Sequence, residues 1–493
     1  MSYPFISHHG AVQGVTGSCH QLHLDSQRSL LVDCGLHSGP EAKSACGSQI
    51  NFPIAGIAAL LVTHVHLDHV GRIPDLIAAG YRGPILCSEP SAVLLPLVLE
   101  DVLKVAGVFE PDEIDQYLRH IRKAIQPVPF EQWHDLIVDD DITCRIRLQR
   151  AGHLLGSAYV ECDVGYPQQG RDQRVVFSGD LGSPQNPLLR APRSPERADI
   201  LVLESTYGDR LHPDRSTRQQ RLEQVIDRAL ADRGTVLIPA FSIGRTQELL
   251  FEIEDILHRK ALLLAEGHDE GCEAPLSPVD WPQLPVILDS PLAAKFTQAY
   301  RDLSAYWNEG AQQRLAEHRS PLQFRQLISI DNHQQHQQVV NYLKSTGRPA
   351  IVIAGNGMCS SGRIVNYLKA MLGDPRHEVL FTGYQAKGTP GAVIQASEGA
   401  EGFVKIDLDG EMYEIKAKVA TIGGYSAHAD QAGLVEFVMG MGELPRCVVL
   451  VHGEDRAKRS LAEKLELHSR ESGVELEVAV PVSLGKVESK IYE

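Results

Sequence analysis

The pattern of hydrophobic and polar positions predicts a series of short buried strands in the first part of the chain. Apolar runs that are too short for helices and are bounded by glycine or acidic residues indicate strands covered on both faces. They lie within residues 29–35, 57–62, 142–148, 175–182 and 199–208. Apolar residues at helical spacing predict helices at residues 70–80, 91–107 and 110–123. This part of the chain therefore predicts a mixed α/β domain.

From about residue 209 the pattern changes to a regular alternation of strands and helices, which is typical of a parallel α/β sheet. Predicted strands lie at residues 234–239, 286–291 and 350–354, and predicted helices at 215–233, 246–258, 293–306 and 364–372. Within this region, residues 264–284 are acidic and rich in proline and glycine. That composition predicts a mobile surface loop.

Strands return after residue 385, where Asp409-Gly410 predicts a hairpin between residues 403–408 and 412–415. A helix opens at residues 427–430, and residues 447–453 form a last buried strand that ends on a histidine. We therefore expect the two ends of the chain to form one domain around an inserted one. The predicted boundaries are residues 1–208 and 386–493 for the two parts of the first domain and 209–385 for the insertion.

A histidine-rich segment at the end of one buried strand carries the clearest chemistry. Residues 63–69 read Thr-His-Val-His-Leu-Asp-His. The alternation points His64 and His66 the same way, while Asp68 and His69 follow on a turn and can face a second ion. Neutral imidazole and carboxylate are ligands that Zn²⁺ takes. A polar loop that happens to be rich in histidine is the alternative, but this density of ligands favours a metal site.

Other predicted strands also end on acidic residues or histidines. Asp180 is a candidate ligand able to bridge two ions, and Glu204 and His452 end two further strands. Asp33 can orient a ligand histidine through its carboxylate, although a turn-capping aspartate would give the same pattern. His153 lies in a loop with flanking glycines and, taken alone, is more typical of a core or surface histidine than of a ligand.

Two glycine-rich loops lie between a strand and a helix in the inserted region, where backbone N–H groups can meet phosphates. A tight strand-to-helix turn explains such loops equally well, and a surface lysine is the alternative for the nearby lysine. The candidate substrate-binding residues are Ser242, Gly244, Arg245, Gly357, Ser360, Ser361, Arg363 and Lys387.

Composition limits the function and the compartment. The chain has 493 residues and a formal net charge of −16, which argues against indiscriminate nucleic-acid binding but leaves room for a local basic groove. The nine cysteines form no Cys-x-x-Cys pair, so neither a disulfide framework nor a thiolate zinc site is predicted. We find no signal-peptide pattern and no apolar run long enough to span a membrane. The expectation is a cytoplasmic protein without a membrane partner.

Taken in chain order, these residues resemble the motifs of a known family. Asp33, His64-x-His66-x-Asp68-His69, His153, Asp180 and His452 are similar to the five motifs of the metallo-β-lactamase superfamily. Glu204 in Glu-Ser-Thr-Tyr-Gly, His428 in Ser-Ala-His-Ala-Asp and His452 in Val-His-Gly-Glu resemble the three additional motifs of its β-CASP nucleases. That group includes the eukaryotic pre-mRNA 3′-end cleavage factor, ribonuclease J and bacterial and archaeal RNA-processing enzymes. The resemblance implies an αββα sandwich with an inserted parallel α/β domain.

By this resemblance two zinc ions bind. One takes His64, His66 and His153, the other Asp68, His69 and His452, and Asp180 bridges them. The pair would hold a hydroxide nucleophile and offset charge on a phosphate. In relatives the counterpart of His428 faces the scissile phosphate, where an imidazole can donate a hydrogen bond or a proton, and Glu204 would hold its ring. Without the family, His428 would also fit a surface histidine.

The resemblance implies a zinc-dependent ribonuclease that cuts single-stranded RNA held in a cleft between two domains. Endonuclease action, 5′-exonuclease action and the RNA target stay open. A DNA nuclease and a small-molecule metallohydrolase, such as a thioesterase or lactonase, are the alternatives. A non-catalytic RNA-binding scaffold is a third, which the complete ligand set disfavours. The sequence leaves the oligomeric state open, with a homodimer as one candidate.

Overall fold

The computed structural model describes residues 3–37, 49–107, 110–213, 215–266, 283–400, 402–481 and 485–486. The chain divides into two compact units. The first unit consists of Met1–Leu211 and Ala427–Glu493, and the second unit is the segment His212–Ser426 between them. Both ends of the chain therefore build one unit, and the second unit is inserted into it.

One seven-stranded sheet of the first unit carries the histidine-rich segment. Its order is β22-β1-β2-β3-β4-β5-β6, in which β3 to β6 run parallel and β1 to β3 antiparallel. Helices α2 (Leu67–Val70), α3 (Ile73–Ala78), α4 (Glu89–Ala106) and α5 (Pro111–Ala124) belong to this part of the unit. The strands are β22 (Gly485–Lys486), β1 (Phe5–His8), β2 (His20–His23), β3 (Ser29–Val32), β4 (Ile57–Leu61), β5 (Ile85–Ser88) and β6 (Ile125–Val128).

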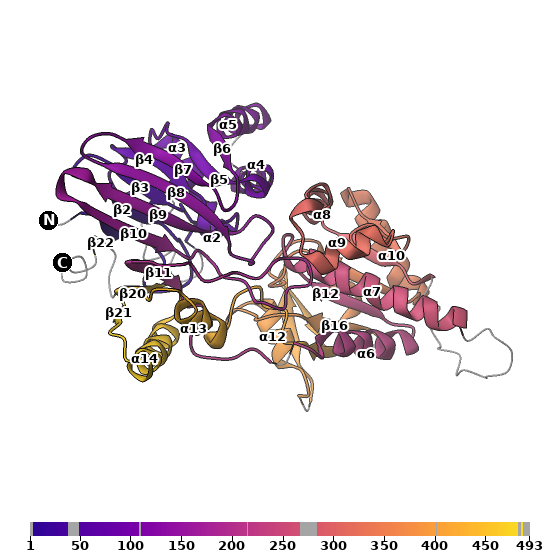
Figure 1. The fold of residues 1–493 in the computed structure, drawn as a ribbon. Helices are drawn as coiled ribbons and strands as arrows, with labels where there is room; N and C mark the ends of the chain where they lie inside the picture. The colour runs from indigo at the N-terminus through magenta and orange to yellow at the C-terminus, as the bar shows by residue number, and fades with distance from the viewer. Residues whose placement is uncertain are drawn as a thin grey trace. The chain divides into compact units, whose positions relative to one another are not determined.

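The other seven-stranded sheet has the order β21-β20-β11-β10-β9-β8-β7. Helices α13 (Gln431–Met439) and α14 (Asp455–Ser472) lie beside it (Figure 1) and share a hydrophobic core with it. On its opposite face, the ring of Phe177 lies 6.3 Å from that of His20 in the first sheet, so the two sheets form the middle layers of an αββα sandwich. The strands are β21 (Glu477–Ala479), β20 (Cys447–Val451), β11 (Ile200–Glu204), β10 (Arg171–Phe177), β9 (Ala158–Tyr166), β8 (Thr143–Arg150) and β7 (Trp133–Val138).

The second unit is built on one six-stranded parallel sheet in the order β14-β13-β15-β12-β16-β19. All six strands therefore end at the same edge, and the loops leaving them gather there. The strands are β14 (Leu327–Ser329), β13 (Val286–Asp289), β15 (Ala350–Ala354), β12 (Thr235–Pro239), β16 (Glu378–Phe381) and β19 (Lys418–Thr421). The helices are α6 (Arg218–Ala231), α7 (Arg245–Glu266), α8 (Pro291–Asp302), α9 (Glu309–Ala316), α10 (His333–Thr346), α11 (Arg363–Met371) and α12 (Pro390–Ala396).

The end of the inserted unit differs from the predicted boundary at residues 385 and 386. Residues beyond this boundary stay with the insertion because β19 pairs in parallel with β16, from Glu378 opposite Lys418 to Phe381 opposite Thr421. The hairpin around Asp409-Gly410, formed by β17 (Lys405–Leu408) and β18 (Glu411–Glu414), packs Ile406 and Leu408 into the core of the same unit. The first unit resumes only at Ala427.

Helix α7 continues to Glu266, well past the predicted end at residue 258. The predicted loop at residues 264–284 therefore begins inside this helix, and its central residues, 267–282, lie outside the described residues. None of the helices in the described part of the chain combines the length and hydrophobicity that a bilayer span requires. The seven described cysteines are buried and free.

Candidate metal centre

The histidine-rich segment leaves β4 and enters the four-residue helix α2. The loop after β3 holds it closely, because the backbone N–H of Cys34 donates to the carbonyl of His69 at 2.7 Å. A Cβ atom at Gly35 would lie only 1.6 Å from the carbonyl oxygen of Asp68. Glycine is thus required there for the two loops to approach.

Four side chains from three loops form the first ligand group: His64, His66, His153 and Asp180. Nδ1 of His66 lies 3.2 Å from Nε2 of His64 and 3.2 Å from Nε2 of His153. Two nitrogens bound to one tetrahedral zinc ion at its usual bond length are about 3.4 Å apart. The three imidazoles are therefore spaced as a shared cation would space them.

A second group consists of Asp68, His69 and His452. Nε2 of His452 lies 3.2 Å from Nε2 of His69 and 3.4 Å from Oδ2 of Asp68. Segments far apart in the sequence thus bring a second set of zinc-type donors together.

Asp180 lies between the two groups. Its Oδ2 is 3.3 Å from Nε2 of His64, and its Oδ1 is 3.3 Å from Nε2 of His69. The carboxylate is almost completely buried, and Oδ1 lacks a hydrogen-bond partner among the described residues. A buried anion is costly without positive charge nearby, so the donor set fits a bound metal cation.

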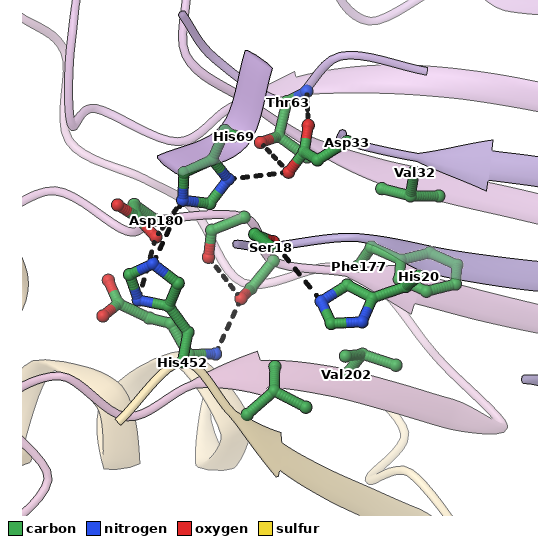
Figure 2. Close-up of a pocket in the computed structure, with 14 residues that line it drawn as sticks. Ser18, His20, Val32, Asp33, Thr63, His69, Phe177, Asp180, Val202 and His452 are labelled. Carbon is green, nitrogen blue, oxygen red and sulfur yellow. Dashed lines mark hydrogen bonds and ion pairs between the residues drawn. The ribbon is translucent and has the colours of Figure 1, made fainter. Parts of the chain in front are cut away.

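The outward nitrogens of His69 and His452 are held by polar side chains. Oδ2 of Asp33 lies 2.7 Å from Nδ1 of His69, and Thr63 donates to the same carboxylate from its hydroxyl at 2.8 Å and from its backbone N–H at 2.8 Å (Figure 2). The Thr206 hydroxyl lies 3.1 Å from Nδ1 of His452. These contacts aim Nε2 of both rings at the ligand group and fix the tautomer. The contacts of Thr63 and Thr206 were not predicted.

Two residues next to the site have left-handed backbone conformations although neither is glycine. Asp33 has a φ of 60° after β3, and His452 has a φ of 52° after β20. The backbone N–H of His452 donates to the carbonyl of Ala11 at 2.7 Å, and that of Gly453 donates to Gly14 at 3.0 Å. The glycine-rich segment near the N-terminus therefore holds His452 in a left-handed conformation. This conformation is costly for any residue except glycine and is common at functional sites.

His428 lies beside this centre and contacts a different carboxylate. Its Nδ1 is 3.2 Å from both oxygens of Glu204, and Oε1 of Glu204 also accepts the N–H of Leu181 at 2.7 Å. Burial lowers the pKa of His428, but the carboxylates of Glu204 and Asp180 outweigh it and raise the pKa to about 9. The imidazole is therefore protonated at neutral pH and can donate a proton.

The ligand histidines of the first group are held in the opposite charge state. Burial, together with the neighbouring His64, lowers the pKa of His66 to about 3. The pKa of His153 also falls well below its usual value because of burial and the nearby His428. Neutral imidazole is the form that coordinates a metal, so burial prepares these rings for an ion.

The candidate substrate-binding residues lie in the second unit, and the structure separates them into two kinds. The guanidinium of Arg245 donates to the carbonyl of Thr382, and that of Arg363 lies 2.5 Å from Oδ1 of buried Asp289. The N–H of Gly244 donates to Gln247 at 2.7 Å. These groups hold the loops together. The side chains of Ser360, Ser361 and Lys387 are exposed, Ser242 is half-buried and Gly357 is buried.

The site is thus of the metallohydrolase kind, in a sandwich domain interrupted by an α/β insertion. Residues 21–240 match the metallo-β-lactamase superfamily, residues 246–394 the β-CASP domain, and residues 412–481 the Zn-dependent metallo-hydrolase RNA specificity domain. The chain belongs to the β-CASP nuclease family of the metallo-β-lactamase superfamily.

The similarity to known proteins extends over most of the chain. Ribonuclease TTHA0252 of Thermus thermophilus is 36% identical over 94% of this chain and 96% of its own length. Transcription termination factor FttA of Methanosarcina mazei is 29% identical over 94% of this chain and 69% of its own length. The same factor of Methanocaldococcus jannaschii is 29% identical over 91% of this chain and 67% of its own length.

Proposed function

We propose that the protein is a two-zinc ribonuclease that hydrolyses phosphodiester bonds of single-stranded RNA. The observation that carries the proposal is two adjacent ligand groups, with Asp180 within 3.3 Å of a histidine of each, and a third group of Asp180, Glu204 and His428 beside them. Two adjacent ions suit hydrolysis of a phosphodiester. The names of the relatives, a ribonuclease and transcription termination factors, support RNA as the polymer.

The ligand residues have distinct roles in this proposal. His64, His66 and His153 would hold one zinc ion and Asp68, His69 and His452 the other, and Asp180 would contribute to both. When bound, the ions would activate a water molecule and offset negative charge on the phosphate. Asp68 and Asp180 lower the net charge of the site without cancelling it, so the centre still attracts an anionic backbone.

His428 supplies what a simple metallohydrolase would lack. The carboxylate of Glu204 raises the pKa of His428 and so favours the protonated ring, which can donate a hydrogen bond to a phosphoryl oxygen or a proton to the departing oxygen. Glu204 accepts from Nδ1, which leaves Nε2 as the donor and keeps the ring charged. Oε1 of the same carboxylate accepts the N–H of Leu181, so Glu204 is itself fixed.

A substrate comparison tests the proposal. The zinc-loaded protein is incubated with end-labelled single-stranded RNA, with the matching DNA and with a panel of thioesters and lactones. We expect hydrolysis of RNA that is abolished by chelator and restored by zinc, with about two zinc ions per chain by elemental analysis. Preferential hydrolysis of DNA or of the small esters would replace the proposal by one of its alternatives.

Substitution of His428 tests the proposed proton donor. His428→Ala should lower kcat by about 10²–10⁴-fold, the range for a positioned acid, while zinc content and RNA affinity stay close to those of the wild type. Glu204→Gln should give a smaller loss, and the double variant should lose no more than His428→Ala because the pair acts as a unit. A His428→Ala protein that cleaves at the wild-type rate, or that loses zinc, would contradict this role.

A further inference from the structure

Two large aromatic side chains are exposed at the edge of the second unit's sheet where its parallel strands end. Phe241 follows β12 and is 51% exposed, and Tyr384 follows β16 and is 63% exposed. The strands β12 and β16 are hydrogen-bonded neighbours, so the loops that carry the two rings leave the sheet side by side. Leaving two rings of this size in solvent forgoes favourable burial, which suggests that they meet a ligand.

The loops that carry these rings are fixed by hydrogen bonds. The carbonyl of Phe241 accepts the Thr246 hydroxyl at 2.7 Å. Nε2 of Gln385 donates to the carbonyl of Gly357 at 3.0 Å and to that of Tyr384 at 3.3 Å. The backbone that carries the two rings is therefore held in place.

The backbone of Gly357 supports one part of the Phe241 ring. A Cβ atom at position 357 would lie 3.2 Å from both Cδ2 and Cε2 of that ring. The glycine lets the ring rest closely against this loop, while Phe241 stays half exposed. The Phe241 ring thus presents a flat apolar face to solvent while its edge packs against Gly357. Such a face suits a planar ligand.

The surroundings of the rings are polar and suit a phosphate backbone. Ser360 and Ser361 are exposed just before helix α11, and Lys387 is exposed in the loop that carries Tyr384. Aromatic faces interspersed with hydroxyls, a cation and helix N-termini are the combination that binds single-stranded nucleic acid. A protein partner would instead favour a contiguous apolar patch, and these neighbours interrupt one.

We propose that Phe241 and Tyr384 form a stacking platform for the bases of single-stranded RNA. The inference rests on the proposed function, because it assumes that the substrate is RNA, and it assigns these two residues to base binding. Any base has a flat face to stack on, so the platform would hold RNA with little sequence preference. The exposed serines and Lys387 would contact the backbone between stacked bases.

Binding to a strand that lacks bases tests the platform. The probes are a hydrolysis-resistant 2′-O-methyl phosphorothioate oligonucleotide that contains 2-aminopurine and an abasic strand with the same backbone, both titrated into zinc-loaded protein. We expect the wild type to bind the base-containing strand about 10-fold more tightly, as one stacked base contributes. Equal affinity for the two strands would overturn the proposal.

Variants separate stacking from loop structure. Phe241→Leu and Tyr384→Leu keep apolar bulk without an aromatic face, so each should reduce the preference for bases and the double variant should abolish it. Phe241→Tyr and Tyr384→Phe keep an aromatic face, so these variants should keep the preference for the base-containing strand. Phe403→Leu is the matched control, because Phe403 is 88% exposed in the same unit and lies away from these loops in sequence. Leucine variants that weaken both strands equally would contradict stacking.

Cleavage of ordinary RNA, measured in parallel, keeps the two proposals distinguishable. A wild type that prefers the base-containing strand but leaves RNA intact would contradict the proposed ribonuclease activity and leave the platform standing. A wild type that cleaves RNA yet binds both strands equally would contradict the platform alone.

Discussion

At the scale of single residues, the candidate metal centre is organised by what the outward nitrogens of its histidines touch. Asp33 holds His69 and Thr206 holds His452. The role of Asp33 could be predicted, because a carboxylate at a strand end beside a metal motif is a common partner of ligand histidines. That of Thr206 could not, because a threonine hydroxyl carries no metal signature and its partner lies 246 positions further along the chain.

These two contacts lead to a prediction about zinc affinity. Asp33→Asn and Thr206→Val should each weaken zinc binding by about 10–100-fold, because the imidazole then loses the partner that orients it and fixes its tautomer. The measurement is a competition titration against a chromophoric chelator. Thr346→Val, on the exposed surface of α10, is the control and should bind zinc like the wild type. Unchanged affinity in the Thr206 variant would show that His452 needs no such partner.

A second residue-scale prediction concerns acid stability. His8 is buried in β1, with its Nδ1 2.8 Å from Nδ1 of His20. Burial, together with the neighbouring His9, lowers the pKa of His8 to about 3. Above the unfolded pKa of about 6.5 the group is neutral in both states and costs nothing. As the pH falls below that value only the unfolded chain gains the proton, so the folded state loses about 1.4 kcal/mol per pH unit until the folded pKa is reached.

The change that tests this is His8→Asn, which keeps a polar atom near the position of Nδ1 but does not titrate. Urea denaturation of the zinc-loaded protein between pH 7 and pH 5 should show a shallower loss of stability for the variant than for the wild type. Exposed His134 provides the matched control, since His134→Asn should follow the wild-type curve. Parallel curves for wild type and His8→Asn would mean that His8 takes up its proton in the folded state.

At the scale of elements, the sequence predicted those whose burial is nearly complete and missed those whose buried face is narrow. The strands Ile57–Leu61, Ile200–Glu204 and Cys447–Val451 are apolar except for the terminal Glu204 and were predicted. Helix α10 was missed because its buried face consists of His336, Val340 and Leu343, and the first of these is a histidine that a hydrophobic pattern does not count. Strand β19 is short and only partly buried, so it was not predicted. The predicted end of the insertion, residue 385, therefore lies before the observed end at Ser426.

The network around Asp289, at the end of β13, gives a prediction at this scale. Asp289 is fully buried, and its carboxylate lies 2.5 Å from Arg363, 2.7 Å from His336 and 2.5 Å from the Tyr367 hydroxyl. Arg363→Met should therefore destabilise the protein by about 1–3 kcal/mol, because the buried carboxylate loses one of its partners. Chemical denaturation measures the change.

The structure thus favours a structural role for Arg363 over the predicted phosphate contact, and a control can separate them. Lys387→Met removes an exposed charge and should leave stability unchanged while weakening RNA binding. If Arg363→Met instead kept the wild-type stability and lost RNA affinity, the phosphate contact predicted from the sequence would hold.

At the scale of the whole molecule, the charge of −16 and the distribution of carboxylates make bound cations important to one unit in particular. Asp33, Asp68, Asp180 and Glu204 converge at the metal centre, which belongs entirely to the first unit. The family resemblance predicted that these carboxylates belong to one site, and Asp33, Asp180 and Glu204 each end a predicted strand. Strand β20 pairs in parallel with β11, which places His452 near Glu204. The pattern of hydrophobic and polar residues does not specify which strands pair or in which register, so this neighbourhood could not be derived from it.

Metal removal should therefore loosen the first unit and spare the second. Without cations the negative charge of the buried Asp180 carboxylate is less well balanced. The loops at the strand ends that meet there should then separate. Hydrogen exchange measured by mass spectrometry after chelation should show faster exchange around residues 63–70 and 451–453. Peptides from β12 and β15, in the core of the second unit, should exchange as in the zinc-loaded protein. Zinc added back should restore protection at the first two segments. Equal loss of protection in both units, or none in either, would show that the ions do not stabilise the first unit selectively.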